Sequence, residues 1–291
     1  MESQYIDIWK YLAQWLDDED RYCLMITCKL AKTLNLLFHE QQHYIQIFSS
    51  SFYHNFTNII IGDIFLYMNR VHTISNITLM LPKNITMLEF CGNFEDQIDE
   101  NMIPTTVTHL CFPTKYHGYE DSHLPSSIKY LSIGSYTRST FVPSSVTHLC
   151  VNNSIILNVS STVKYLTIVD LFGGHITASI SYLKIINVNV FFNYIPLSVT
   201  HLFLKKCHLV NFDIQSSIKY LAFDDSFNIP LNNLDFRSIT HLTLGKSYNR
   251  SLKNLPTTVT HIFIDESYQG NLPPHVNLSF EVPAWIDEFY F

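Results

Sequence analysis

The sequence has few glycines and few charged residues, and each shortage excludes a class of function. Only 8 of the 291 residues are glycine, which disfavours loops that cradle phosphate groups. Charged residues make up 15% of the chain and the formal net charge is -7, whereas a protein that binds nucleic acid needs a basic face. We therefore expect no nucleic-acid partner.

Motifs for disulfides, membranes and catalysis are missing as well. The six cysteines include no Cys-x-x-Cys pair, so we interpret them as reduced thiols of a cytoplasmic protein. We find no signal-peptide pattern and no run of about 18 apolar residues that would predict a membrane span. A Gly-x-Ser-x-Gly motif is absent, and the acidic run 17–20 lacks the glycine and final glutamate of a calcium loop. We expect no membrane contact, no enzyme activity, no metal and no cofactor.

An apolar unit recurs about ten times between residues 81 and 264, and Leu124–Ile133 is one copy. Its apolar residues Ile128, Leu131 and Ile133 occupy positions 0, +3 and +5, and the last step of two is the period of a strand. Successive copies are 17 to 22 residues apart. Because one unit cannot bury its own apolar side, the copies must stack as a solenoid. The position 0 residues are Ile85, Val107, Ile128, Val146, Val163, Ile180, Val199, Ile218, Ile239 and Val259.

Two further positions of the unit are typical of leucine-rich repeats. Position -3 is proline in six copies, which suits a turn outside the hydrogen-bonded sheet. Position +8 is often small and polar, and we expect it to hydrogen-bond a turn from inside the coil. These +8 residues are Asn93, Ser154, Cys207, Ser226, Ser247 and Ser267. The predicted fold is a leucine-rich-repeat-like parallel β-sheet arc of short repeats of about 20 residues, mostly loop on the convex side, with a small N-terminal α-helical domain.

A column of rings is predicted on the open face of this sheet, because position +2 points away from the residues at 0, +3 and +5. The column could be structural, stiffening the sheet by stacking, or it could be a surface that binds a partner protein. A metal site on His241 and His261 would need further ligands that no nearby carboxylate or thiol supplies. The +2 residues are His109, Tyr130, His148, Tyr165, Tyr182, His201, Tyr220, His241 and His261.

The patterns of apolar and aromatic residues divide the chain into four parts. Residues 1–45 are predicted to form a small helical domain, and residues 46–80 a transition with a degenerate first repeat. The repeat array covers residues 81–280. Residues 281–291 contain Trp285, Ile286 and Phe289, and we interpret them as an aromatic cap that closes the far end of the solenoid.

The array closely resembles the FNIP repeat family. The tetrapeptide that gives the family its name stands at Phe227–Pro230, and the phrase Leu-Pro-Ser/Thr-Ser/Thr-Val-Thr-His-Leu stands with one change at Leu255–Ile262. Proteins of this family often carry an F-box before the repeats and occur in social amoebae and in giant viruses of amoebae. A viral origin would imply the host cytoplasm.

The N-terminal helices resemble an F-box, with an apolar series, an Asp and a Cys-Lys pair in the expected order. The usual opening Leu-Pro is absent. The resemblance implies a non-catalytic, monomeric substrate adaptor whose helices bind the linker protein of a cullin-based ubiquitin ligase, while the solenoid holds an unknown target protein. The alternative is an interaction scaffold whose helices only cap the solenoid. The implied linker-binding residues are Ile8, Leu12, Trp15, Leu16, Leu24 and Cys28.

Overall fold

The computed structural model describes part of the chain, in two compact units, residues 1–128 and 129–291. The predicted F-box residues and residues 288–291 lie outside the described part. The described residues are 42–43, 58–61, 81, 84–90, 98, 103–113, 116, 124–135, 142–152, 156–170, 175–177, 179–187, 195–206, 214, 216–234 and 236–287.

The first unit contains parallel strands. These are β1 (Gln42–His43), β2 (Asn58–Ile61), β3 (Met87–Phe90) and β4 (His109–Cys111). Each strand pairs with the next, and Ile59, Leu88 and Leu110 are aligned across three of them. The parallel pairing therefore begins before residue 81, where the sequence pattern first becomes regular.

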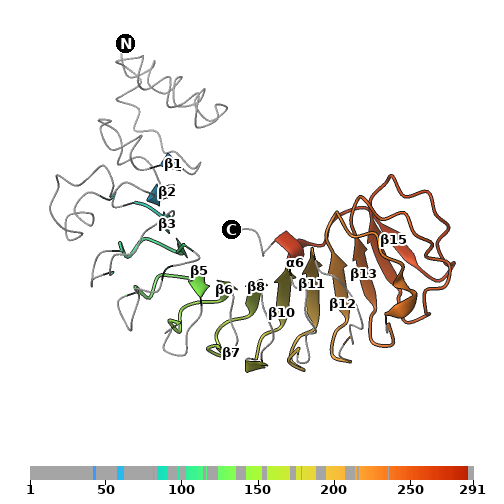
Figure 1. Ribbon diagram of the computed structural model, residues 1–291, viewed down its shortest axis with the longest axis horizontal. Helices are drawn as coiled ribbons and strands as arrows, with labels where there is room; N and C mark the ends of the chain where they lie inside the picture. Colours follow the sequence, from blue (N-terminus) through green and yellow to red (C-terminus); the bar gives the residue numbers. More distant parts are fainter. Residues whose placement is uncertain are drawn as a thin grey trace, which may run out of the picture. The chain divides into compact units, whose positions relative to one another are not determined.

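The second unit is a longer run of parallel strands in the order β5-β6-β8-β10-β11-β12-β13-β14-β15 (Figure 1). Equivalent residues of successive repeats are direct partners, as Leu149, Leu166 and Leu183 are. The predicted parallel-sheet solenoid is confirmed. The strands are β5 (Tyr130–Ser135), β6 (His148–Asn152), β8 (Tyr165–Val169), β10 (Tyr182–Ile186), β11 (His201–Lys205), β12 (Tyr220–Phe223), β13 (His241–Leu244), β14 (His261–Ile264) and β15 (Asn277–Ser279).

Little else in the described chain is regular. Strands β7 (Ile156–Asn158) and β9 (His175–Thr177) pair with each other in the return segments, and η4 (Leu231–Asn233) is a single 3-10 turn. The chain's described α-helix is α6 (Ala284–Asp287). Within the described residues, no helix has the length and apolar character needed to cross a membrane.

The apolar residues of the repeat form the core. All ten residues at position 0 are 0% exposed, and those at position +3 are at most 1% exposed. The +5 residues are at most 5% exposed. Burying one such aliphatic side chain stabilises a fold by about 1.5–3 kcal/mol, so the stacked columns account for the strictness of the repeat.

Where a described proline stands three residues before position 0, it belongs to a tight turn. Its carbonyl oxygen accepts a hydrogen bond from the backbone N–H of the position 0 residue, at 3.0 Å for Pro104 and Val107 and at 3.0 Å for Pro256 and Val259. Proline fixes its own φ and supplies only this acceptor, which is what the first residue of such a turn requires. The turn then delivers the apolar residue at position 0 into the core.

The sequence-based interpretation of position +8 is wrong in the copies that the structure describes. Ser226, Ser247 and Ser267 are exposed, and the aromatic residues that follow them point inward instead. Phe227 is 6% exposed and its ring stacks on Phe223 with centroids 3.8 Å apart. A turn closed by the N–H of Phe227 and the carbonyl of Asp224, 3.1 Å apart, directs the ninth residue rather than the eighth into the coil.

The C-terminal segment folds back over the sheet. After β15 the chain returns, and α6 lies over the strands at β10 to β12 (Figure 1), where Ile286 packs with Phe203 and Ala222. A cap at the end of the array would have placed these side chains next to β15. Leu278 and Phe280 remain 45% and 53% exposed there. We call residues 280–287 the tail segment.

Candidate functional site

Eight of the nine predicted +2 rings form one continuous stack in the second unit, which we call the ring ladder. Neighbouring ring centroids are 4.1 to 4.4 Å apart, and most pairs are stacked. The parallel strands beneath are spaced by about 4.8 Å, which places every ring within contact of the next. His109 occupies the equivalent position on β4 of the first unit. The ring ladder consists of Tyr130, His148, Tyr165, Tyr182, His201, Tyr220, His241 and His261.

Every histidine of this column is held by the threonine that precedes it. The Thr Oγ1 lies 2.8 or 2.9 Å from the His Nδ1 in all five cases. The same hydroxyl also lies 3.2 to 3.4 Å from a backbone carbonyl oxygen of the preceding repeat. The threonine therefore fixes the ring orientation. The pairs are Thr108–His109, Thr147–His148, Thr200–His201, Thr240–His241 and Thr260–His261.

The tautomer of the last histidine follows from its two partners. A carbonyl oxygen can only accept, so when Thr260 donates to the carbonyl of Thr240 it accepts from Nδ1–H of His261. Asn277 continues the column on β15, and its Nδ2 lies 3.4 Å from the Nε2 of His261, where it can donate. Together these two contacts favour the tautomer of His261 that is protonated at Nδ1 and has Nε2 as the acceptor.

Two histidines of the ladder, His201 and His241, favour the neutral form. Burial, followed by the charge of His241, lowers the pKa of His201 from 6.5 to about 4. Burial and then His261 lower the pKa of His241 as well. A neutral ring stacks on tyrosine without desolvating a charge, so His201 and His241 contribute uncharged rings to the column at neutral pH.

The neighbouring +4 column is buried over β8 to β12, although it lies on the face that the sequence predicts to be open. Lys184 is 3% exposed, and its Nζ lies 5.1 Å from the centroid of Phe203. Burial, and then repulsion by Lys205, lowers the pKa of Lys184 to about 8. The ammonium over an aromatic face is an attractive contact that offsets part of this desolvation.

The tail segment covers part of this column, at Phe203 and Ala222. Ile286 is 5% exposed, and the cluster that it forms with Phe203 and Ala222 also touches Tyr165 and Tyr182. The Trp285 ring meets His201 edge-on, with centroids 5.1 Å apart. One helical turn, closed by the N–H of Ile286 and the carbonyl of Pro283 at 2.9 Å, presents both side chains to the sheet.

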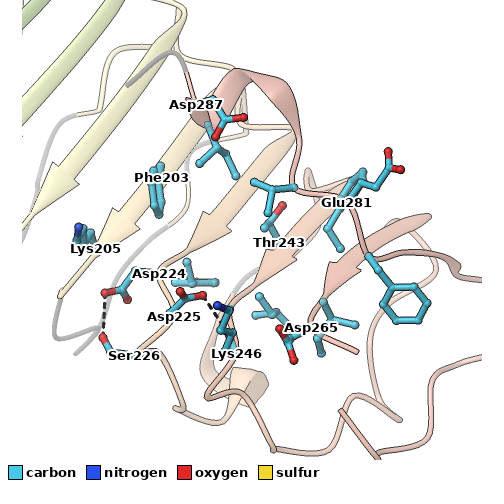
Figure 2. A pocket seen from close by; sticks show the side chains of 18 of the residues that line it. Phe203, Lys205, Asp224, Asp225, Ser226, Thr243, Lys246, Asp265, Glu281 and Asp287 are labelled. Carbon is cyan, nitrogen blue, oxygen red and sulfur yellow. Dashed lines mark hydrogen bonds between the residues drawn. The ribbon is translucent and has the colours of Figure 1, made fainter. Parts of the chain in front are cut away.

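Two cavities flank the tail segment. One of about 420 Å³ lies between it and the ends of β11 to β14, lined by Phe203, Phe263 and Ile286 among others (Figure 2). Charged side chains of both signs rim it, including Lys205 and Asp287. The second, of about 220 Å³, lies beneath Pro283 and Trp285 against Tyr220 and His241. The contact between tail and sheet is therefore incompletely packed.

The sequence predicted the ring ladder, but not the threonine hydroxyls that hydrogen-bond its histidines or the tryptophan that packs on it. The Thr-His dipeptide recurs at five copies and could have indicated the paired hydroxyls. Nothing periodic links Trp285 to β11, so its docking left no sequence signal. Across the described residues, no three His, Cys, Asp or Glu side chains gather where they could hold a metal ion.

One comparison, with known protein families, supports the repeat assignment over part of the chain. The FNIP Repeat family model matches residues 76–115, which contain the copies that begin at Ile85 and Val107. Among solved structures, the chain is similar to one described as the crystal structure of CroV588, a novel circular LRR protein, at 22% identity and a TM-score of 0.44. That match covers 77% of this chain but 40% of the other. No curated protein matches the chain.

Proposed function

We propose that this protein is a non-catalytic interaction module that binds a partner protein along the ring ladder. The observation that carries the proposal is the stack of eight rings, most of them partly exposed, on one face of the second unit. Rings that are already stacked and hydrogen-bonded lose little side-chain entropy on binding, and aromatic side chains supply a large contact area.

The regularity of the face also supports this role. A solenoid presents equivalent side chains at each repeat, so a partner can contact several turns at once. The buried columns at positions 0, +3 and +5 hold the backbone beneath the ladder rigid, which places the rings before the partner arrives. None of this requires a reaction at the surface.

The finer proposal is that the chain is a substrate adaptor of a cullin-based ubiquitin ligase. It rests on the resemblance of the N-terminal residues to an F-box, with Leu16 and Leu24 among the apolar residues that would contact the linker protein. The adaptor makes no bond itself. It raises the effective concentration of the target protein near the ligase.

Two sets of substitutions separate the two binding activities in affinity purifications of the full chain. Leu16→Asp with Leu24→Asp should abolish recovery of linker and cullin, while recovery of the target protein stays unchanged. Tyr130→Ala with His148→Ala, on strands that the tail segment does not cover, should lose the target and retain the linker. Circular dichroism checks that each variant is folded.

The outcomes decide between the two candidate roles. Normal recovery of linker and cullin by the Leu16/Leu24 variant, or no recovery by the wild type, would contradict the adaptor role and leave an interaction scaffold. Unchanged recovery of the target by the Tyr130/His148 variant would contradict binding along the ring ladder.

A further inference from the structure

The tail segment shows what kind of ligand the covered part of the face accepts. It places a tryptophan edge against His201 and an isoleucine on Phe203 and Ala222, which are 3% and 0% exposed. Ala222 is the smallest side chain of the +4 column, and the space above it is what Ile286 fills. The site thus selects an aromatic residue followed directly by a branched aliphatic one.

Proline sets the shape of this ligand. Pro283 directly precedes the single turn of α6, and its carbonyl accepts the N–H of Ile286 at 2.9 Å. A fixed φ at the first position of a turn lowers the entropy that the segment loses on docking. The recognised unit is therefore short, Pro-Ala-Trp-Ile, and carries its own conformation.

The attachment of the tail segment is limited. Of the four residues of α6, only Ile286 is buried. The preceding Phe280 and Val282 are 53% and 60% exposed. A cavity of about 420 Å³ (Figure 2) and a second one of about 220 Å³ lie against the tail segment. A segment whose described contacts with the sheet leave cavities beside them can be displaced by a ligand that packs better.

We propose that the face of β10 to β14 is a binding site for a Pro-x-Trp-Ile peptide of a partner protein, and that the tail segment occupies this site until the partner displaces it. This inference rests on the proposed function, because it assigns the ligand chemistry of the same face. A tethered occupant has a local concentration in the millimolar range for a short linker, so the partner peptide must compete with it. If the tail is docked nine-tenths of the time, competition weakens the apparent affinity about tenfold.

Fluorescence polarisation with two labelled synthetic peptides tests the inference. One peptide copies residues 280–288 of this chain, and the other carries Pro-Ala-Trp-Ile between Gly-Ser flanks. Both should bind the full-length Trp285→Ala/Ile286→Ala variant about tenfold more tightly than the wild type. A peptide with Ala in place of Trp should not bind. Leu197→Ala, at a 72% exposed side chain away from the tail contacts, is the matched control and should bind like the wild type.

The second variant is designed to block the peptide site. Ala222→Leu, introduced into the Trp285/Ile286 background, fills the space of the isoleucine and should abolish peptide binding while the circular dichroism spectrum stays unchanged. If both peptides bind the wild type and the Trp285/Ile286 variant equally, or bind neither, the inference is overturned. Self-association of the wild type that the same variant loses would assign the tail to a second copy of the chain and also overturn it.

Failure here is distinguishable from failure of the proposed function. If neither peptide binds but the Tyr130/His148 variant still loses the target protein, the ring ladder binds a partner and only the assignment of its ligand is wrong. If the peptides bind as expected but that variant retains its target, the peptide site exists without the wider role of the ladder.

Discussion

Tyr248 carries a hydroxyl that the repeat does not need. The side chain is 2% exposed and, among the described residues, its hydroxyl has no hydrogen-bond partner. Phe227 holds the equivalent place one repeat earlier and lies in the same stack, with ring centroids 6.0 Å apart. A buried hydroxyl without a partner costs about 1–3 kcal/mol. Burial is also the main cause that raises the pKa of Tyr248 to about 12.

Tyr248→Phe is therefore expected to raise the free energy of unfolding by about 1 kcal/mol. Tyr268→Phe is the matched control one repeat later, because its hydroxyl donates to the carbonyl of Arg250 at 3.0 Å. That change should lower stability by about 0.5–1.5 kcal/mol. Urea unfolding monitored by circular dichroism measures both. Destabilisation by Tyr248→Phe would show that its hydroxyl is satisfied in solution.

At the scale of the strand, the ring ladder makes stability depend on pH. The pKa of His201 is about 4 in the fold and 6.5 in an unfolded chain, so between these values the unfolded state binds more protons. The contribution of His201 to stability is fully present above pH 6.5 and is lost as the pH falls toward 4. Strands β11 and β13, whose histidines both have a lowered pKa, are therefore expected to lose stability in acid.

His201→Tyr should remove this contribution while keeping the stack, since tyrosine already occupies the same position on β10 and β12. We expect the wild type to lose more stability than the variant between pH 7.5 and pH 4.5, as measured by urea unfolding at several pH values. The carboxyl groups titrate in both proteins and cancel in the comparison. Equal losses would mean that His201 is protonated without penalty.

How much the sequence could predict depended on whether a contact repeats. Leu131 and Ile133 were assigned to the core, and Tyr130 to the open face, because the strand period of two allows one arrangement. The residue that points into the coil was predicted at position +8 but lies at +9, because a change of turn geometry shifts the inward-pointing side chain by one residue. The docking of Ile286 on Ala222 occurs once, between the tail segment and a strand far from it in sequence, and no period could reveal it.

For the whole molecule, stability should depend on the number of neighbours that each repeat has. Leu166 and Leu278 occupy the same column of the sheet, but Leu166 on β8 lies between β6 and β10 and is 0% exposed. Among the described strands β15 pairs with β14 alone, and Leu278 is 45% exposed. In a solenoid each repeat is stabilised mainly by its nearest neighbours. The same truncation should therefore lower stability more in a middle repeat than in an end repeat.

Leu166→Ala is expected to lower the free energy of unfolding by about 2–5 kcal/mol, because it leaves a cavity with strands on both sides. Leu278→Ala should cost less than about 1 kcal/mol, since its side chain gives up little buried area. Amide hydrogen exchange of the wild type should follow the same order, slowest at β8 and fastest at β15. Similar costs for the two truncations, or equal protection of β8 and β15, would show that the second unit unfolds as one cooperative block in which the end repeat is as firmly held as the middle.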